Sequence, residues 1–127
     1  MRDLERYEDL EAWKAAMELV QEVYDLARQF PEEEKQRLAT HMCTAALKIP
    51  AKIAASTGYK NLKITYWYLA ICHALLHTLE THLKTAVRLK YIQKTDAAPA
   101  LEKCKKIGRM VDELMMPEGL RDLEDNE

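Results

Sequence analysis

Two histidines and a glutamate stand at helical spacing in the middle of the chain, and their types suggest metal chemistry. His73 and His77 are four residues apart and Glu80 follows three residues later, so a helix would place all three on one face. Imidazole and carboxylate groups arranged in this way can bind a divalent metal. A di-iron bundle would also need Glu-x-x-His pairs, which the sequence lacks. We therefore predict no metal and no cofactor, and we favour an interface between subunits as the place of the histidines.

Three consecutive aromatic residues, Tyr66-Trp67-Tyr68, are the second group that could do chemistry. Aromatic side chains can stack on nucleobases, as they do in RNA-binding platforms. On a helix, however, three consecutive side chains point in different directions, which favours packing in the core and at an interface. The predicted oligomer interface comprises Tyr66, Trp67, Tyr68, His73 and His77.

Basic residues are concentrated in the central part of a chain whose formal net charge is only −2. The net charge is −5 over residues 1–37, +9 over residues 38–109 and −6 over residues 110–127. A basic region of this kind is typical of a protein that binds a polyanion. The predicted nucleic-acid-binding residues are Lys48, Lys52, Lys60, Lys63, Lys84, Arg88, Lys90 and Lys94. Glu80 is the single acidic residue between Lys48 and Lys94. The alternative is a solvated face whose cations pair with the acidic first helix, either across the bundle or across an interface.

No catalytic motif accompanies these groups. Glycine-rich phosphate loops, GxSxG elbows and clustered carboxylates are absent from the sequence, so we predict that the protein is not an enzyme. The three cysteines form no CxxC pair, which favours reduced thiols in the cytoplasm. The acidic N-terminus is unlike a signal peptide, and the longest apolar stretch, residues 64–76, is too short to span a bilayer. We therefore expect a cytoplasmic protein that does not contact a membrane.

Long helices must position these residues, because only 3 glycines and 4 prolines occur in 127 residues. The hydrophobic pattern predicts helices over about residues 10–30, 32–57, 61–92 and 96–116, with Pro50 inside the second. We expect Asp9 to cap the first helix and Gly58 to end the second in a left-handed conformation. The prediction is an all-α, antiparallel up-down four-helix bundle domain over residues 1–117, followed by an acidic, disordered tail over residues 118–127.

The apolar stripes predict which sides of the helices face inward. In the first helix the spacing of three and four favours a stripe of large side chains. This stripe comprises Leu10, Trp13, Met17, Val20, Tyr24 and Ala27. The third helix has two apolar seams, one through Leu69, Leu76 and Leu83 and one through Cys72 and Leu79. A bundle helix needs one apolar face, so either another subunit covers the second or the helix is central in its own bundle.

Three segments give the chain a resemblance to a known family of small bacterial proteins. They read YEDLEAWKAAMELVQEVYDLARQFP over residues 7–31, AALKIPAKIA over residues 45–54 and LAICHALLHTLETHLKTAVRLKYI over residues 69–92. In these the chain resembles the four-helix bundle proteins encoded by intervening sequences of large-subunit ribosomal RNA genes. Their relatives include the accessory variability determinants (Avd) of diversity-generating retroelements. The resemblance implies a homo-oligomeric ring, typically a homopentamer, and for the Avd branch a basic surface that binds RNA or DNA beside a reverse transcriptase.

The chain also departs from that family. Cys43-Thr44 stands where the intervening-sequence proteins usually have two arginines, and the run that follows contains Lys48 and Lys52 and lacks the usual glutamate. This difference moves the resemblance towards a basic, Avd-like surface. The leading hypothesis is a non-catalytic accessory or scaffold protein that binds nucleic acid. The rivals are an adaptor whose basic face docks an acidic protein, and an assembly with no function outside a selfish element.

Overall fold

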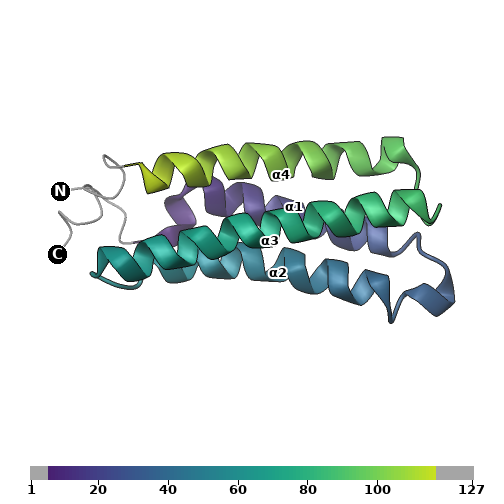
Figure 1. Ribbon diagram of the computed structural model, residues 1–127, viewed down its shortest axis with the longest axis horizontal. Helices are drawn as coiled ribbons and strands as arrows, with labels where there is room; N and C mark the ends of the chain where they lie inside the picture. Colours follow the sequence, from purple (N-terminus) through teal and green to yellow (C-terminus); the bar gives the residue numbers. More distant parts are fainter. Residues whose placement is uncertain (1–5, 117–127) are drawn as a thin grey trace.

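The computed structural model describes residues 6–116, and four long helices dominate this part of the chain (Figure 1). The helices are α1 (Glu11–Ala27), α2 (Leu38–Ser56), α3 (Leu62–Arg88) and α4 (Lys94–Met115). Two short 3₁₀ helices, η1 (Tyr7–Asp9) and η2 (Glu32–Glu34), precede α1 and α2. Residues 6–116 include no strand and no helix with the length and apolar character needed to cross a membrane. The tail predicted over residues 118–127 lies outside the described residues.

Each long helix packs along two others, so the four surround a single core. Contacts join α1 to α2, α2 to α3, α3 to α4 and α4 back to α1. The rings of Phe30 and Tyr91 lie 5.5 Å apart, which brings the α1–α2 and α3–α4 connections together at one end of the molecule (Figure 1). Ala16, Met42, Leu79 and Ile107, one from each helix, are fully buried in the core. The sequence prediction of a four-helix, all-α protein is therefore confirmed.

Local hydrogen bonds decide where α3 and α4 begin. The Asn61 side chain accepts hydrogen bonds from the amides of Lys63 (2.8 Å) and Ile64 (3.3 Å), which satisfies two otherwise free donors at the start of α3. At α4 the Asp96 carboxylate reaches back to accept from the Gln93 amide at 3.0 Å. The predicted start at Asp96 is therefore two residues late, because Asp96 lies in the first turn of α4.

Two predicted boundaries differ more from the structure. The second helix was expected from about residue 32, but α2 begins at Leu38 because the backbone of Arg37 (φ −119°, ψ −105°) is not helical. Asp9 does not cap α1. It lies within η1, and the residue before α1 is Leu10, which has no side chain able to accept a hydrogen bond.

The left-handed turn expected at Gly58 is found at the end of α3 instead. Within residues 6–116 no glycine has a positive φ, whereas Lys90 has φ of 65°. The Tyr91 amide donates to the Ala86 carbonyl (2.9 Å) and the Lys90 amide to the Val87 carbonyl (3.0 Å). This pair of bonds is the Schellman motif, which usually has glycine at the position of Lys90. A side chain with a Cβ is therefore held in a conformation that disfavours it.

The inner face of α1 is made of smaller residues than the sequence pattern predicted. From the predicted stripe only Leu10 is buried, while Trp13, Val20, Tyr24 and Ala27 are half-buried and Met17 is 45% exposed. The buried positions of α1 are Ala12, Ala15, Ala16, Leu19, Val23 and Leu26. This set has the same helical spacing as the predicted stripe but lies elsewhere around the helix. Hydrophobic spacing alone does not show which of two such stripes faces the core. In the structure, the stripe that contains three alanines faces inward.

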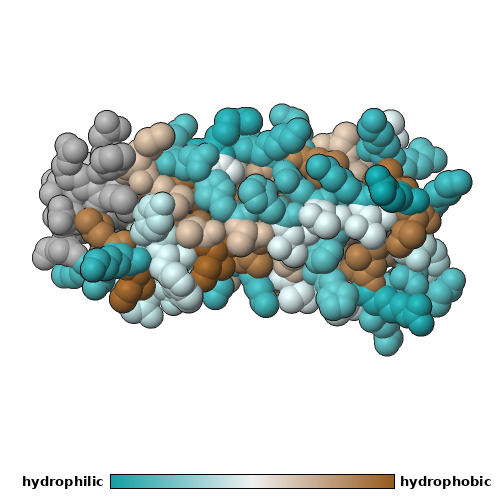
Figure 2. Space-filling model, viewed as in Figure 1, coloured by the Kyte–Doolittle hydropathy of each residue, from teal (hydrophilic) through white to brown (hydrophobic). Residues whose placement is uncertain are grey.

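One stripe of α3 faces the core, and it takes residues from both predicted seams. Leu69, Leu76 and Leu83 come from one seam and Cys72 and Leu79 from the other, and all five are buried. The aromatic run was expected partly in the core, which is wrong: Tyr66 is 49% and Trp67 56% exposed, and Tyr68 is half-buried. Figure 2 accordingly shows apolar side chains among polar ones on the face that α2, α3 and α4 present to the viewer.

The Lys90 conformation yields a test of the α3 terminus. Replacing Lys90 with glycine should raise the free energy of unfolding by about 1 kcal/mol, because glycine has no Cβ to clash in the left-handed region. Urea denaturation measures the change. Lys90→Ala is the matched control, since it removes the same charge but keeps a Cβ, and it should give no such gain. Equal stabilities for the glycine and alanine variants would contradict the argument.

Candidate nucleic-acid interface

Four of the predicted basic residues surround the connection between α2 and α3. Lys48 and Lys52 lie one turn apart on α2, Lys60 lies in the connection, and Lys63 lies in the first turn of α3. We call these four residues the α2–α3 lysines. Lys52 is half-exposed and the other three are exposed.

A buried hydrogen bond holds this connection in place. The Thr65 hydroxyl, 1% exposed, donates to the Ser56 carbonyl at 3.1 Å, joining the first turns of α3 to the end of α2. The Ser56 hydroxyl in turn donates to the Ile53 carbonyl at 2.6 Å. Because buried polar groups that are fully bonded are costly to disrupt, the five residues between the two helices are anchored on both sides.

The α2–α3 lysines have no acidic neighbour to neutralise them in the described part of the chain. None lies within ion-pair distance of a carboxylate there, and residues 35–79 contain no Asp or Glu at all. The alternative derived from the sequence has these cations paired with the acidic first helix. Such pairs do not form for these four within residues 6–116, and pairing across an interface stays a prediction. Their charges are left to act on solvent and on ligands.

The other four predicted basic residues lie far from this group. Lys84 and Arg88 are exposed near the end of α3, Lys90 follows the helix, and Lys94 begins α4. At 1.5 Å per residue, Lys63 and Arg88 are about 37 Å apart along α3. The eight predicted residues therefore form two groups rather than one continuous patch. Their role in binding stays a prediction.

Lys103 shows the opposite behaviour, because α1 does neutralise it. Its ammonium lies 3.0 Å from Glu18 Oε1 and 2.6 Å from Glu22 Oε2, which links α4 to α1. The hydrogen bonds to Glu22 and Glu18 raise the pKa of Lys103, and the hydrogen bond from Lys103 lowers the pKa of Glu18. Lys103 is not among the eight predicted binding residues, and its ion pairs link two helices of the bundle.

The aromatic residues of α3 form a cluster with a residue that the sequence analysis did not single out. Tyr59, in the α2–α3 connection, stacks on Tyr68 with ring centroids 5.8 Å apart and an interplanar angle of 17°. Trp67 meets the same Tyr68 ring edge-on at 5.0 Å. The sequence feature that could have pointed to Tyr59 is its position between Gly58 and Lys60, in a turn close to the aromatic run. Tyr66, although adjacent in sequence, makes no aromatic contact within residues 6–116.

His73 and His77, which the sequence favours as interface residues, lie on α3, and their role at an interface stays a prediction. His73 Nε2 lies 2.7 Å from Asp112 Oδ1 of α4, close enough for an ion pair when the imidazole is protonated, though not with regular hydrogen-bond geometry. The rings of His73 and His77 are 6.5 Å apart. In the described part of the chain, no three His, Cys, Asp or Glu residues are grouped closely enough to hold a metal ion.

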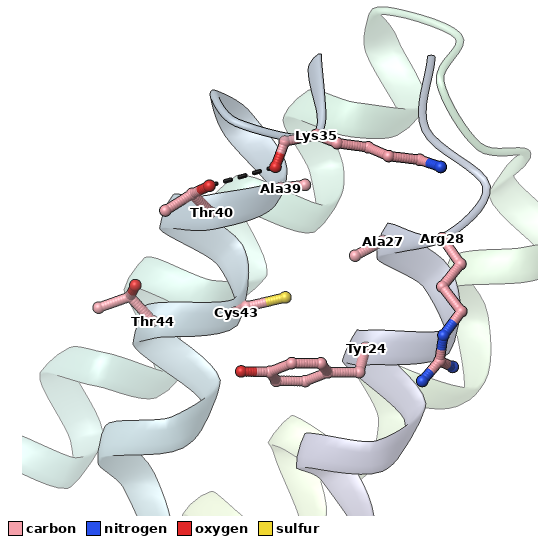
Figure 3. Close-up of a pocket in the computed structure, with 8 residues that line it drawn as sticks. All are labelled: Tyr24, Ala27, Arg28, Lys35, Ala39, Thr40, Cys43 and Thr44. Atoms are coloured by element: carbon pink, nitrogen blue, oxygen red, sulfur yellow. Dashed lines mark hydrogen bonds between the residues drawn. The ribbon is translucent and has the colours of Figure 1, made fainter. Parts of the chain in front are cut away.

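A second candidate surface runs along α1 and α2, opposite in character to the lysines. Tyr24 and Cys43 face each other across a pocket of about 390 Å³, with Ala27 and Ala39 also lining it and Arg28 at its rim (Figure 3). The other residues that line the pocket are Lys35, Thr40 and Thr44.

Apolar side chains continue this surface beyond the pocket. Met17 lies two turns before Tyr24 on the same side of α1, and Leu47 lies one turn after Cys43 on the same side of α2. Met17 is 45% and Leu47 49% exposed. We call this surface the α1–α2 strip; it comprises Trp13, Met17, Val20, Tyr24, Cys43 and Leu47. These six side chains are uncharged, although Arg28 and Lys35 line the pocket between the two helices. Apolar patches on the surface of soluble proteins often mark contacts with other proteins.

The three thiols are free and unsuited to nucleophilic chemistry. Burial raises the pKa of Cys72 and of Cys104 to about 12. Burial also raises the pKa of Cys43, against a smaller opposing effect of the Arg28 charge. Because the thiolate is the reactive form, all three cysteines remain protonated near neutral pH.

These features together define a class of protein: a small helical bundle with a basic surface, an apolar surface and no assembled catalytic group within residues 6–116. The sequence matches the family described as 23S rRNA-intervening sequence protein over residues 8–113. The chain belongs to this family, which confirms the resemblance seen in the sequence. Among curated proteins, nothing matches the chain.

The Lys103 contact gives a prediction about pH. Because the folded state lowers the pKa of Glu18, the carboxylate stabilises the fold above its ordinary pKa, and this contribution is lost as the pH falls through the folded-state value. Glu18→Gln should therefore show a smaller loss of unfolding free energy than the parent protein between neutral and acidic pH. Urea denaturation across that range measures it. Glu11→Gln is the control, because Glu11 is an exposed glutamate of α1 whose ion pair is with Lys14 on the same helix. Identical pH profiles for Glu18→Gln and the parent would contradict the linkage.

Proposed function

We propose that this protein is a non-catalytic accessory protein that binds RNA or DNA through the α2–α3 lysines. The observation that carries the proposal is the lack of any carboxylate over residues 35–79, where these four cations lie unpaired within the described chain. Unpaired lysines on rigid helices attract phosphates and release condensed counterions when they bind them. The family description associates these proteins with 23S ribosomal RNA, which agrees with a role beside a nucleic acid.

Binding through lysines should carry little sequence information. An ammonium is a compact point charge without the planar fork with which arginine reads guanine edges. Contacts to phosphates fix the position of a protein on a nucleic acid but do not specify its sequence. The expected activity is therefore attachment to a polyanion, with selection by shape.

Self-association belongs to the same proposal. Connections of five residues join α2 to α3 and α3 to α4, and short connections between packed helices favour the antiparallel, up-down order. The α1–α2 strip gives this bundle an apolar surface to cover, and a second copy of the chain is the occupant we propose. The residues predicted from α3 are the alternative interface. A ring would repeat the α2–α3 lysines around an axis; five copies is the number that the family resemblance suggests.

The partner beyond nucleic acid is a further part of the proposal. A reverse transcriptase is the candidate that the resemblance to the Avd proteins suggests. The rival function is an adaptor whose lysines dock an acidic protein without nucleic acid. That rival shares the basic surface and differs in what the surface binds.

Charge reversal tests the binding surface. Lys48→Glu combined with Lys52→Glu should weaken binding to an RNA or DNA oligonucleotide, and the slope of log affinity against log salt should fall by about 1 for each phosphate that the variant no longer neutralises. Thermal stability should change little, because exposed charges contribute little to folding. Fluorescence anisotropy at several salt concentrations, beginning near about 50 mM, measures both the affinity and its salt dependence.

Two matched variants interpret the result. Lys14→Glu with Arg37→Glu makes the same change in net charge at two residues that pair locally with acids and lie outside the pocket, and it should reduce binding less. Lys84→Glu with Arg88→Glu tests the distant basic group. If all three pairs lose the same affinity, the loss depends on net charge alone and not on the α2–α3 lysines. A parent protein that binds no oligonucleotide at low salt would leave the adaptor as the better hypothesis.

Single substitutions test the assembly. Sedimentation at micromolar concentration should give a mass several times the 14.7 kDa of one chain. Met17→Glu or Leu47→Glu should reduce it to that of the monomer, because burying a charge in an apolar contact is costly. Far-UV circular dichroism should be unchanged, since both side chains are about half exposed in the single chain.

Trp67→Glu discriminates between the two candidate surfaces. Trp67 is 56% exposed on α3, is not part of the strip, and belongs to the interface predicted from α3. If this variant dissociates while Met17→Glu and Leu47→Glu stay assembled, the α1–α2 strip is not the interface. A parent protein that sediments as a monomer would remove self-association from the proposal.

A further inference from the structure

The aromatic cluster next to the α2–α3 lysines has features that packing in the core does not explain. The rings of Tyr59, Tyr68 and Trp67 contact one another with centroids 5.0–5.8 Å apart. Tyr59 is 50% and Trp67 56% exposed, so these rings contribute little to the core. One face of Tyr59 lies against Tyr68, which leaves its opposite face as the exposed one.

The cluster is held rigidly although it lies at a turn. Thr65 is bonded to Ser56 across the connection, and Asn61 caps α3 two residues after Tyr59. Trp67 and Tyr68 are part of α3 itself. The exposed aromatic faces are therefore preorganised, which lowers the entropy that a ligand must overcome when it stacks on them.

Positive charge surrounds the cluster on every element that forms it. Lys52 Nζ of α2 lies 5.6 Å from the centre of the Tyr68 ring. Lys60 follows Tyr59 directly, and Lys63 lies one helical turn before Trp67, on the same side of α3. No acid occurs over residues 35–79, so no carboxylate of this segment competes for these cations. Stacked aromatic rings among unpaired cations match a ligand that has both flat rings and phosphates.

We propose that this cluster binds an unpaired nucleobase, which stacks on the exposed face of Tyr59 or on Trp67 while Lys52, Lys60 and Lys63 contact the adjoining phosphates. The inference rests on the proposed nucleic-acid function and narrows it to single-stranded segments, because the bases of a duplex are already stacked on one another. Every base has a π-face, so the preference is for unpaired over paired strands rather than for a sequence. This interpretation differs from the favoured sequence prediction, in which the aromatic run packs in the core or at an interface.

The test compares nucleic acids that share a backbone and differ in their bases. Three fluorescein-labelled probes are used: an oligouridine of about 12 nucleotides, an abasic phosphodiester of the same length, and a duplex RNA of similar length. Tyr59→Leu and Trp67→Leu remove an aromatic face while keeping an apolar side chain. Tyr66→Leu is the matched control, since Tyr66 is 49% exposed on the same helix but makes no aromatic contact within residues 6–116. Tyr59→Phe keeps the ring.

Stacking predicts a selective loss of affinity. Tyr59→Leu and Trp67→Leu should weaken oligouridine binding by about fivefold or more each, and change abasic and duplex binding by less than about twofold. Tyr66→Leu and Tyr59→Phe should bind as the parent does. Oligouridine should quench the tryptophan fluorescence of the parent and the abasic probe should not, and the quenching should be lost in Trp67→Leu.

Several results would overturn the inference, and they separate it from the proposed function. Equal losses of affinity for the oligouridine and abasic probes, or no loss for either, would refute stacking while leaving phosphate binding intact. A lower sedimentation mass for Tyr59→Leu or Trp67→Leu, with oligonucleotide affinity unchanged, would assign the cluster to a contact between subunits. If the parent binds none of the three probes at low salt, the nucleic-acid function and this inference both fail.

Discussion

The small inner face of α1 is the constraint on which the surfaces of this protein depend. Ala12, Ala15 and Ala16 face the core, and the larger core side chains come mainly from other helices, such as Met42 on α2 and Leu79 on α3. Alanine adds little volume, so α1 can lie close to its neighbours at the density that protein interiors require. With this face inside, the large apolar side chains of Trp13, Met17, Val20 and Tyr24 are left half-buried or exposed. The α1–α2 strip is thus a consequence of core packing.

Electrostatic separation is the second organising feature. Acidic residues concentrate at the N-terminal end of the chain and basic residues in the middle, but the fold lets only some of them meet. Lys103 lies between Glu18 and Glu22 and joins α4 to α1, whereas the α2–α3 lysines lie on helices that contain no acid near them. A lysine that is paired inside the molecule links two helices, whereas an unpaired lysine remains available to bind a phosphate. The distinction separates lysines that look alike in the sequence.

The connection between α2 and α3 brings several of these features together. Ser56 and Thr65 are the only buried polar residues in the described chain, and their hydrogen bonds set how the two helices meet. Tyr59 and Lys60 take their positions from that junction, so a turn that would otherwise be mobile carries an ordered ring and a cation. Rigid elements that present aromatic and basic groups together are what binding sites for single strands require.

The sequence by itself determined the helical class and the family, and its hydrophobic spacing is enough to identify several inner positions of α2 and α4. For Met42, Ile49 and Ile53, and for Cys104, Ile107 and Val111, one apolar stripe is available, so periodicity has one answer. It could not determine the orientation of α1 or of α3, where two stripes of similar character compete. That choice depends on how side-chain volumes from four helices fill one interior, which is a property of the assembled bundle.

The tertiary structure alone also decided which residues meet across the chain. The Tyr59–Tyr68 stack, the His73–Asp112 contact and the Lys103 ion pairs each join residues 9 or more positions apart. Helical spacing predicts neighbours one or two turns away and is silent beyond that range. The sequence could therefore predict that lysines and aromatic residues are present in the candidate site. Only the packing of the helices decides which of them are unpaired, exposed and side by side.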